Sequence, residues 1–108
     1  MSERPTLILP DWPAPSTVGA FVTTRESGPS QGAFASFNPA DHVGDDPVTV
    51  AACRRRLSAE LDDDRPLLWL EQVHGANVQQ EYRADFAERA PRADASVAFD
   101  TGHACVVL

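Results

Sequence analysis

The stretch that says most about the fold is Leu67-Leu68-Trp69-Leu70-Glu71-Gln72-Val73-His74-Gly75. Its apolar first half predicts a buried strand, because short apolar runs bounded by turn residues are typical of sheet interiors. Gly75 allows the chain to turn directly after the histidine. The pattern therefore places His74 at a strand end, where a side chain can face a cleft.

His74 is the first candidate for catalysis or metal binding, because histidine is the most common metal ligand and titrates near neutral pH. A lone histidine is more often a packed or surface residue, and spacing alone leaves that alternative open. His103 and Cys105 lie two residues apart on an expected strand and would share one face, which permits a shared metal. A buried thiol is the better-supported role for Cys105, since cysteine packs well in cores.

Length and charge narrow the class of protein. The chain has 108 residues and a formal net charge of −7 at pH 7. One modest core is the limit at this size. We expect no nucleic-acid partner, because proteins that bind the phosphate backbone need a basic face. The sequence shows neither a signal peptide nor an apolar run long enough to span a bilayer, so we also expect no membrane partner and a cytoplasmic location.

The periodicity predicts a mixed α/β fold of the α+β class. Its clearest helix opens at Asp46-Pro47, an N-cap followed by a residue suited to the first helical position, and should run over 47–61. Cys53 lies on the apolar face of this helix and is expected to be structural. Strands are expected within 7–9, 18–24, 67–73, 77–82, 94–99 and 103–108.

Two strand pairings follow from this pattern. Residues 77–82 are expected to return beside 67–73 as its neighbour. Residues 94–99 and 103–108 are joined through Asp100-Thr101-Gly102, a turn of the kind that closes hairpins. The segment 83–92 is polar and is expected to be a loop or a short helix.

Polar loops carry the remaining candidates. Arg25 ends a strand beside a Gly/Ser-rich loop, where a guanidinium and backbone donors can clamp an anion; a surface ion pair explains it nearly as well. His42 and Asp45 precede the helix and are open to two readings. They contact a ribose or a metal, or they hold the turn by local hydrogen bonds, and composition favours the turn.

Several motifs, taken in order, resemble one family. They are Gly19-Ala20-Phe21-Val22-Thr23-Thr24-Arg25, Phe34-Ala35-Ser36-Phe37-Asn38, His42-Val43-Gly44-Asp45-Asp46-Pro47, Gln72-Val73-His74-Gly75 and Ala93-Asp94-Ala95. This order is similar to that of the bacterial laccase-domain proteins, first described as polyphenol oxidase-like and later as purine nucleoside phosphorylases or peptidoglycan editing factors. The family fold is a mixed α/β layered sandwich of more than twice this length. The resemblance therefore implies that residues 1–108 are the N-terminal part of a larger single domain.

The resemblance also implies a catalytic zinc held by two histidines and one cysteine. The first histidine corresponds to His74. The family cysteine follows the last apolar strand in an Ala-Asp-Cys motif, so its role does not pass to Cys105, and the other ligands are expected beyond Leu108. Zinc bound by His74 alone would be held weakly, because catalytic zinc usually has three protein ligands. Copper is less favoured, since one histidine cannot build a multicopper cluster.

The activity implied for the full-length relative is phosphorolysis of adenosine, inosine or methylthioadenosine, with deamination of adenosine as a second reaction. The partners are then a purine nucleoside and phosphate, and the isolated fragment is expected to be inactive. Arg25 is the candidate for phosphate, with Asn38 or His42 near the sugar. One alternative is hydrolytic editing of peptidoglycan precursors. Another is a non-catalytic binding or assembly module, for which exposed edges of the core would favour self-association.

Overall fold

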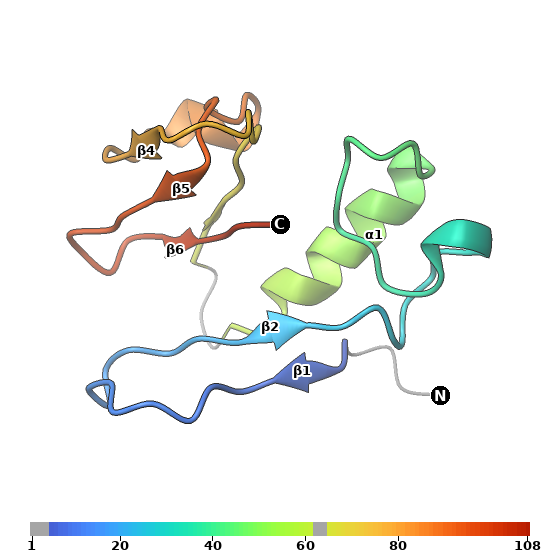
Figure 1. Ribbon diagram of the computed structural model, residues 1–108, viewed down its shortest axis with the longest axis horizontal. Coiled ribbons are helices and arrows are strands. Elements are labelled where there is room, and N and C mark those ends of the chain that lie inside the picture. Colours follow the sequence, from blue (N-terminus) through green and yellow to red (C-terminus); the bar gives the residue numbers. More distant parts are fainter. Residues whose placement is uncertain (1–4, 62–64) are drawn as a thin grey trace. The chain divides into compact units, whose positions relative to one another are not determined.

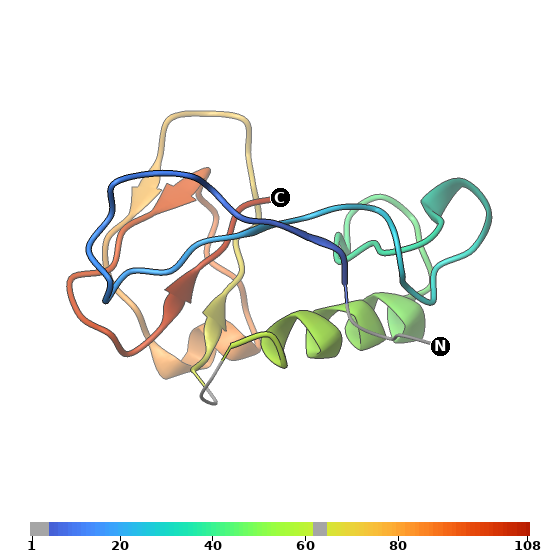
Figure 2. The same cartoon turned by 90° about the horizontal axis from the view of Figure 1, so that it is seen from below.

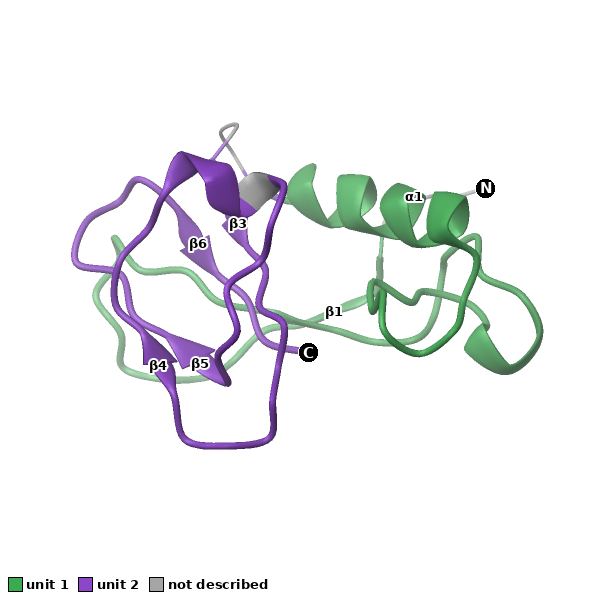
Figure 3. Cartoon of the chain, turned by 90° about the horizontal axis from the view of Figure 1, so that it is seen from above, with its two compact units in different colours: residues 1–60 green, residues 61–108 purple. Residues whose placement is uncertain are grey.

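The computed structural model describes residues 5–61 and 65–108. The chain divides into two compact units, residues 1–60 and residues 61–108, coloured green and purple in Figure 3. Both contain helical and extended segments, so the predicted mixture of α and β structure is confirmed. In chain order, the elements are β1 (Leu7–Ile8), β2 (Val22–Thr23), η1 (Gly32–Phe34), α1 (Pro47–Ser58), β3 (Leu67–Leu68), β4 (Val78–Gln79), η2 (Ala84–Ala87), β5 (Ala95–Ser96) and β6 (Ala104–Cys105), where η marks a 3-10 helix (Figure 1).

The first unit begins with an antiparallel pair of short strands. β1 and β2 lie side by side, with Ile8 opposite Val22 (Figure 1). The pairing extends one step further, because the Thr24 N–H donates to the Thr6 carbonyl at 3.0 Å. Both strands lie where the sequence predicts them but are shorter than expected.

Helix α1 confirms the predicted start and ends earlier than predicted. The Asp46 carboxylate accepts from the Thr49 N–H at 3.1 Å, as an N-cap should. Cys53 is completely buried on the helix face that also buries Val50 and Leu57. The helix stops at Ser58 rather than at residue 61, because the N–H groups that follow bond back over three residues as well as four and tighten the last turn. Figure 2 shows α1 as one unbroken coil.

In the loop between β2 and α1, the backbone at Gly28 lies against the backbone of Ser36 and Phe37. A Cβ added at Gly28 would meet the Ser36 carbonyl oxygen and would lie only 2.8 Å from the Phe37 nitrogen. The Ser30 N–H donates to the same Ser36 carbonyl at 2.8 Å. Gly28 is therefore required by space, because backbone atoms cannot move aside as the end of a flexible side chain can.

Replacing Gly28 by alanine should lower the free energy of unfolding by about 1–3 kcal/mol, the usual cost of forcing extra atoms into packed surroundings. Gly19→Ala is the matched control, since nothing lies within 4 Å of a Cβ added there. Chemical denaturation of both variants checks the prediction. Equal stability of the two would show that the Gly28 approach does not constrain the fold.

The second unit corrects the predicted strand pairing. β3 pairs in parallel with β6, and β4 pairs in parallel with β5. The expectation that 77–82 returns beside 67–73 is therefore wrong. The expectation of a hairpin between 94–99 and 103–108 is also wrong, because β5 and β6 belong to different sheets.

The turn chemistry explains why the hairpin expectation failed. The Asp100 carboxylate accepts from the Gly102 N–H at 2.8 Å, so the turn forms as its residues indicate. Such a bond fixes the turn alone and does not choose the partner of the strand that follows. The Ala104 N–H donates to the Pro66 carbonyl at 2.9 Å, which carries β6 to β3 instead.

A small apolar cluster forms the core of the second unit. Leu68, Leu70 and Ala93 are buried, and the partly buried Tyr82 and Phe86 pack against them. η2 contributes Phe86 and lies beside β3 (Figure 2). The expected strand over 67–73 is thus confirmed only in its first part, where alternate leucines point into the core.

His103 and Cys105 do not share an environment. The His103 ring is buried and stacks on Tyr82 with 4.6 Å between ring centroids. Cys105 is exposed, which contradicts the expectation of a buried thiol. Strand β6 begins only at Ala104, so His103 lies outside the regular alternation on which the shared face was predicted.

Among the residues that the structure describes, no helix has the length and apolar character needed to cross a membrane.

Candidate functional site

His74 lies at the tip of an exposed turn in the second unit. β3 ends at Leu68, and the last sheet-like pairing before the turn is the isolated bridge between Glu71 and Arg92. His74 itself has a φ of 58°, whereas Gly75 does not have a positive φ. The turn therefore depends on the histidine and not on the glycine that the sequence indicated. A positive φ is uncommon outside glycine and costs roughly 1–2 kcal/mol, so surrounding bonds must hold it.

Those bonds come from the carboxylate of Asp94. Its Oδ1 accepts from the backbone N–H groups of Val73 at 2.9 Å and His74 at 2.6 Å, and its Oδ2 accepts from the Gly75 N–H at 2.8 Å. Three successive N–H groups thus converge on one side chain. Hydrogen bonds to an ionised acceptor are stronger than those between neutral groups, so Asp94 fixes the conformation of the turn.

The backbone around Asp94 closes the same turn at both ends. On one side, the Glu71 N–H donates to the Pro91 carbonyl at 2.9 Å and the Glu71 carbonyl accepts from Ala93 at 3.1 Å. On the other side, the Asp94 N–H donates to the Asn77 carbonyl at 2.9 Å. The segment 91–95 therefore bonds to both ends of the loop 72–76, and the Asp94 side chain bonds to the backbone within that loop.

The electrostatics of Asp94 agree with this geometry. Partial desolvation raises the pKa of Asp94, but hydrogen bonds from the Gly75, Val73 and His74 N–H groups outweigh it and hold the pKa below the ordinary value of 3.8. The carboxylate is thus ionised at neutral pH and is committed to the backbone. The imidazole of His74 is left exposed on a fixed backbone, which is an arrangement suited to a metal ligand.

A second hydrogen-bonded cluster lies in the first unit around Asp45. Its Oδ2 accepts from the buried Ser30 hydroxyl at 2.8 Å and from the Asn38 amide at 3.1 Å, and its Oδ1 accepts from the Asp46 N–H at 2.8 Å. Desolvation raises the pKa of Asp45. The hydrogen bonds lower it by more, so the pKa lies below its ordinary value. Both oxygens serve the local structure, so of the two readings for Asp45 the structure favours the hydrogen-bonded turn.

Asn38 is also held within this cluster. Its side-chain oxygen accepts from the Ala40 N–H at 3.2 Å, and its backbone N–H donates to the Cys53 sulfur at 3.4 Å. The backbone of Asn38 thus joins the loop to the buried face of α1, and its side chain bonds within the loop. Its first role is to shape the loop.

Arg25 braces the loop that follows β2. Its Nε donates to the Ala35 carbonyl at 2.7 Å and its Nη2 to the Ala33 carbonyl at 3.4 Å. Its own carbonyl accepts from the N–H groups of Ser36 and Phe37. A guanidinium has five N–H donors, so this exposed side chain retains donors for an anion.

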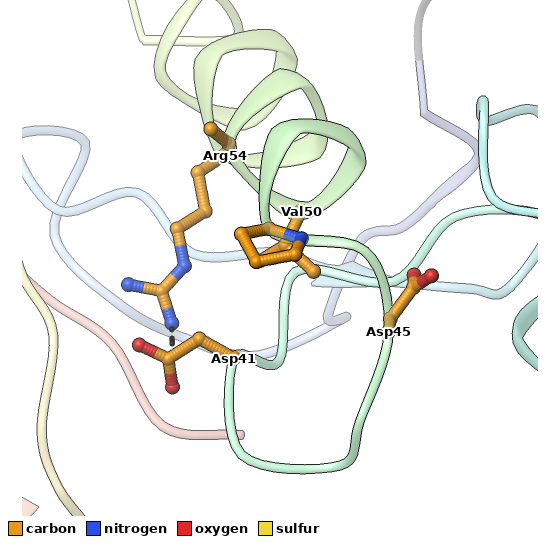
Figure 4. Close-up of a pocket in the computed structure, with 6 residues that line it drawn as sticks. Asp41, Asp45, Val50 and Arg54 are labelled. Carbon is orange, nitrogen blue, oxygen red and sulfur yellow. Dashed lines mark ion pairs between the residues drawn. The ribbon is translucent and has the colours of Figure 1, made fainter.

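A pocket of about 280 Å³ opens between α1 and the loop that precedes it. Figure 4 shows Arg54 reaching from α1 toward Asp41, with 3.4 Å between Nη2 and Oδ1. Burial lowers the pKa of Arg54, while the attraction of Asp41 opposes this change. His42 lies beside Asp41 and is exposed, with 4.0 Å between Nδ1 and Oδ1. The pocket is lined by Asp41, Asp45, Pro47, Val50, Ala51 and Arg54.

The candidate residues fall in different parts of the chain. Arg25, Asn38 and His42 belong to the first unit, and His74 belongs to the second. Within the described ranges 5–61 and 65–108, no three or more His, Cys, Asp or Glu side chains are grouped so that they could hold a metal ion. Any metal on His74 therefore needs ligands besides those that the described residues bring together.

Two residues important to these sites were not singled out from the sequence. Asp94 acts on a turn 20 residues earlier in the chain, and a carboxylate that binds backbone N–H groups leaves no residue-type pattern. The motif Ala93-Asp94-Ala95 does not indicate this role. Arg54 is one of three consecutive arginines, and its bonds to Pro39 and Asp41 cannot be foreseen from that run.

Comparison with known proteins identifies relatives over most of the chain. The chain is 48% identical over 94% of its length to a purine nucleoside phosphorylase of Pseudomonas aeruginosa and covers 39% of that protein. It is 39% identical over 94% of its length to purine nucleoside phosphorylase YfiH of Escherichia coli and covers 41% of it. The chain thus spans about two fifths of the length of these relatives.

A solved structure extends the similarity to the fold. The crystal structure of Neisseria meningitidis protein NMB0706, of the DUF152 family, superposes with a TM-score of 0.84 and 38% sequence identity. The match covers 94% of this chain and 40% of that chain. Residues 19–108 also match the family model described as multi-copper polyphenol oxidoreductase laccase. On these grounds, the chain belongs to the laccase-domain family.

Proposed function

We propose that this chain is the N-terminal part of a zinc-dependent purine nucleoside phosphorylase. The observation that carries the proposal is the 48% identity, over 94% of the chain, to a protein that bears that name. The turn of residues 73–75 supports it, because Asp94 holds the backbone and leaves the His74 imidazole exposed.

The His74 imidazole fits zinc as one ligand, and the site needs further ligands. Imidazole is a preferred zinc ligand, and a backbone fixed by hydrogen bonds lowers the conformational cost of binding. When bound, zinc would act as a Lewis acid and supply hydroxide near neutral pH, which deamination of adenosine requires. Copper is the weaker proposal despite the family description, because the proposed phosphorolysis and deamination involve no change of oxidation state.

In phosphorolysis, a phosphate oxygen forms a bond to the anomeric carbon of the ribose while the bond from that carbon to the base nitrogen breaks. The electron pair of the broken bond leaves with the base, which takes up a proton. The step needs a cation to hold phosphate, and we assign this role to Arg25 because it retains donors beyond those given to Ala33 and Ala35.

The sugar is assigned to the loop that precedes α1. His42 is exposed there and is the proposed direct contact. The Asp41 carboxylate of the adjoining pocket can accept hydrogen bonds from hydroxyl groups. Asn38 would act by shaping this loop, since its amide already bonds to Asp45 and Ala40.

Product analysis of the full-length protein tests the proposal. The zinc-loaded protein is incubated with adenosine in the presence and absence of phosphate, and the products are separated by chromatography. We expect adenine and ribose 1-phosphate only when phosphate is present, with inosine as the product of deamination. If neither adenine nor inosine forms, the enzymatic proposal is wrong. Amino-acid release from a nucleotide-linked muramyl precursor would instead support the editing alternative.

A further inference from the structure

Gln72 joins the His74 turn to the segment that leaves β6. Its side-chain oxygen accepts from the backbone N–H of Leu108 at 2.9 Å, a contact between residues 36 positions apart. The side chain is half-buried and lies two residues before His74. No requirement of the turn itself calls for this bond, because Asp94 and the backbone of 91–95 already close it.

The bond continues an alignment that the backbone begins. β3 and β6 pair in parallel, with Leu67 beside Ala104 and Leu68 beside Cys105. Continued in the same register, Leu108 would lie beside Glu71, but the Glu71 backbone turns to Pro91 and Ala93 instead. The side chain of Gln72 therefore bonds to Leu108 where the backbone ladder has ended.

We propose that Gln72 is a positioning residue that fixes the segment following β6 against the His74 turn. The inference rests on the proposed function, because the alignment of β6 with the His74 turn matters only if His74 binds zinc. The relatives are about two and a half times as long as the region they share with this chain, which is 39–41% of their length. In such a protein, Gln72 would fix the position of the chain at Leu108 relative to the His74 turn, and zinc on His74 would require further ligands.

Two variants of Gln72 test the hydrogen bond to Leu108. Gln72 acts as an acceptor, so Gln72→Glu keeps an oxygen in place, whereas Gln72→Met keeps the side-chain length and apolar stem but removes the oxygen. Both variants are made in the full-length protein. Amide hydrogen exchange at Leu108 is measured without metal, and zinc affinity is measured by competition with a chelator.

In Gln72→Met we expect exchange at Leu108 to become about 5- to 10-fold faster, the effect of losing one ordinary hydrogen bond. We expect zinc affinity to fall by roughly 10-fold, as it does when groups that orient metal ligands are lost. Gln72→Glu should retain both properties, which a general loss of packing would not explain.

The outcomes separate the two proposals. Unchanged exchange at Leu108 in Gln72→Met overturns the Gln72 contact. Faster exchange with unchanged zinc affinity overturns the positioning role while the metal proposal stands. A wild-type protein that binds no zinc overturns the proposed function, and with it the purpose assigned to Gln72, whatever the exchange rates.

Discussion

A full-length protein carrying His74→Asn should lose its zinc and at least about 100-fold of its phosphorolysis activity. Removing a group that only orients a metal ligand costs roughly 10–100-fold, and removing a ligand should cost no less. Asparagine is the informative replacement because it tolerates the positive φ of 58° at this position, while its amide is a poor zinc ligand. Alanine would add backbone strain to the loss of the imidazole.

The fold should be unaffected by His74→Asn, with a change in unfolding free energy within about 0.5 kcal/mol, because the side chain is exposed. His42→Asn is the matched control for metal content, since His42 is another exposed histidine and lies in the first unit. It should keep its zinc. Zinc content measured by elemental analysis decides the matter, and equal zinc in both variants would remove His74 from the ligand set.

The second large effect is expected from Asp94→Asn. An amide in this position directs an N–H₂ group at backbone donors that now converge on carboxylate oxygens, so at least one of these N–H groups loses its partner. The turn would loosen and His74 would no longer be held on a fixed backbone. Zinc affinity of the full-length protein should fall by roughly 10–100-fold, although Asp94 itself touches no metal.

The control for Asp94→Asn is Asp100→Asn in the same unit. Among the described residues, the Asp100 carboxylate has one hydrogen-bond donor, the Gly102 N–H, and asparagine keeps an oxygen that can accept from it. Amide exchange at residues 73–75 should accelerate in Asp94→Asn and stay unchanged in Asp100→Asn. If Asp94→Asn binds zinc as tightly as the wild type, the carboxylate is a structural clamp with no bearing on the site.

Local signals in the sequence predicted local structure well. Asp46 caps α1 and Cys53 is buried on its inner face, because capping and helical spacing depend on residues within a few positions of each other. The β1 and β2 strands were also found, although their lengths were overestimated. These features need no knowledge of distant parts of the chain.

Strand partners could not be predicted in the same way. The turn Asp100-Thr101-Gly102 forms as its residues indicate, yet the strands on its two sides join different sheets. Their partners are chosen by burial of residues such as Leu68 and by bonds to distant carbonyls such as that of Pro66. The residues of a turn determine only how the chain reverses there. They do not determine which strand pairs with the one that follows.

The candidate site shows the same difference between local signals, which were predicted, and distant contacts, which were not. His74 was identified from its motif, but the cause of its conformation was assigned to Gly75, whereas the structure attributes it to Asp94 and to the positive φ of His74 itself. Contacts between a side chain and a remote backbone depend on tertiary structure and leave no periodic trace in the sequence. The Gln72 bond to Leu108 escaped notice for this reason as well.

The most direct measurement is anomalous X-ray diffraction from crystals of the full-length protein, recorded on both sides of the zinc absorption edge. Our account predicts a zinc peak about 2.0–2.1 Å from an imidazole nitrogen of His74. It also predicts that the Asp94 carboxylate still accepts from the backbone of residues 73–75 in that structure. A zinc peak away from His74, with this side chain free in solvent, would contradict the account.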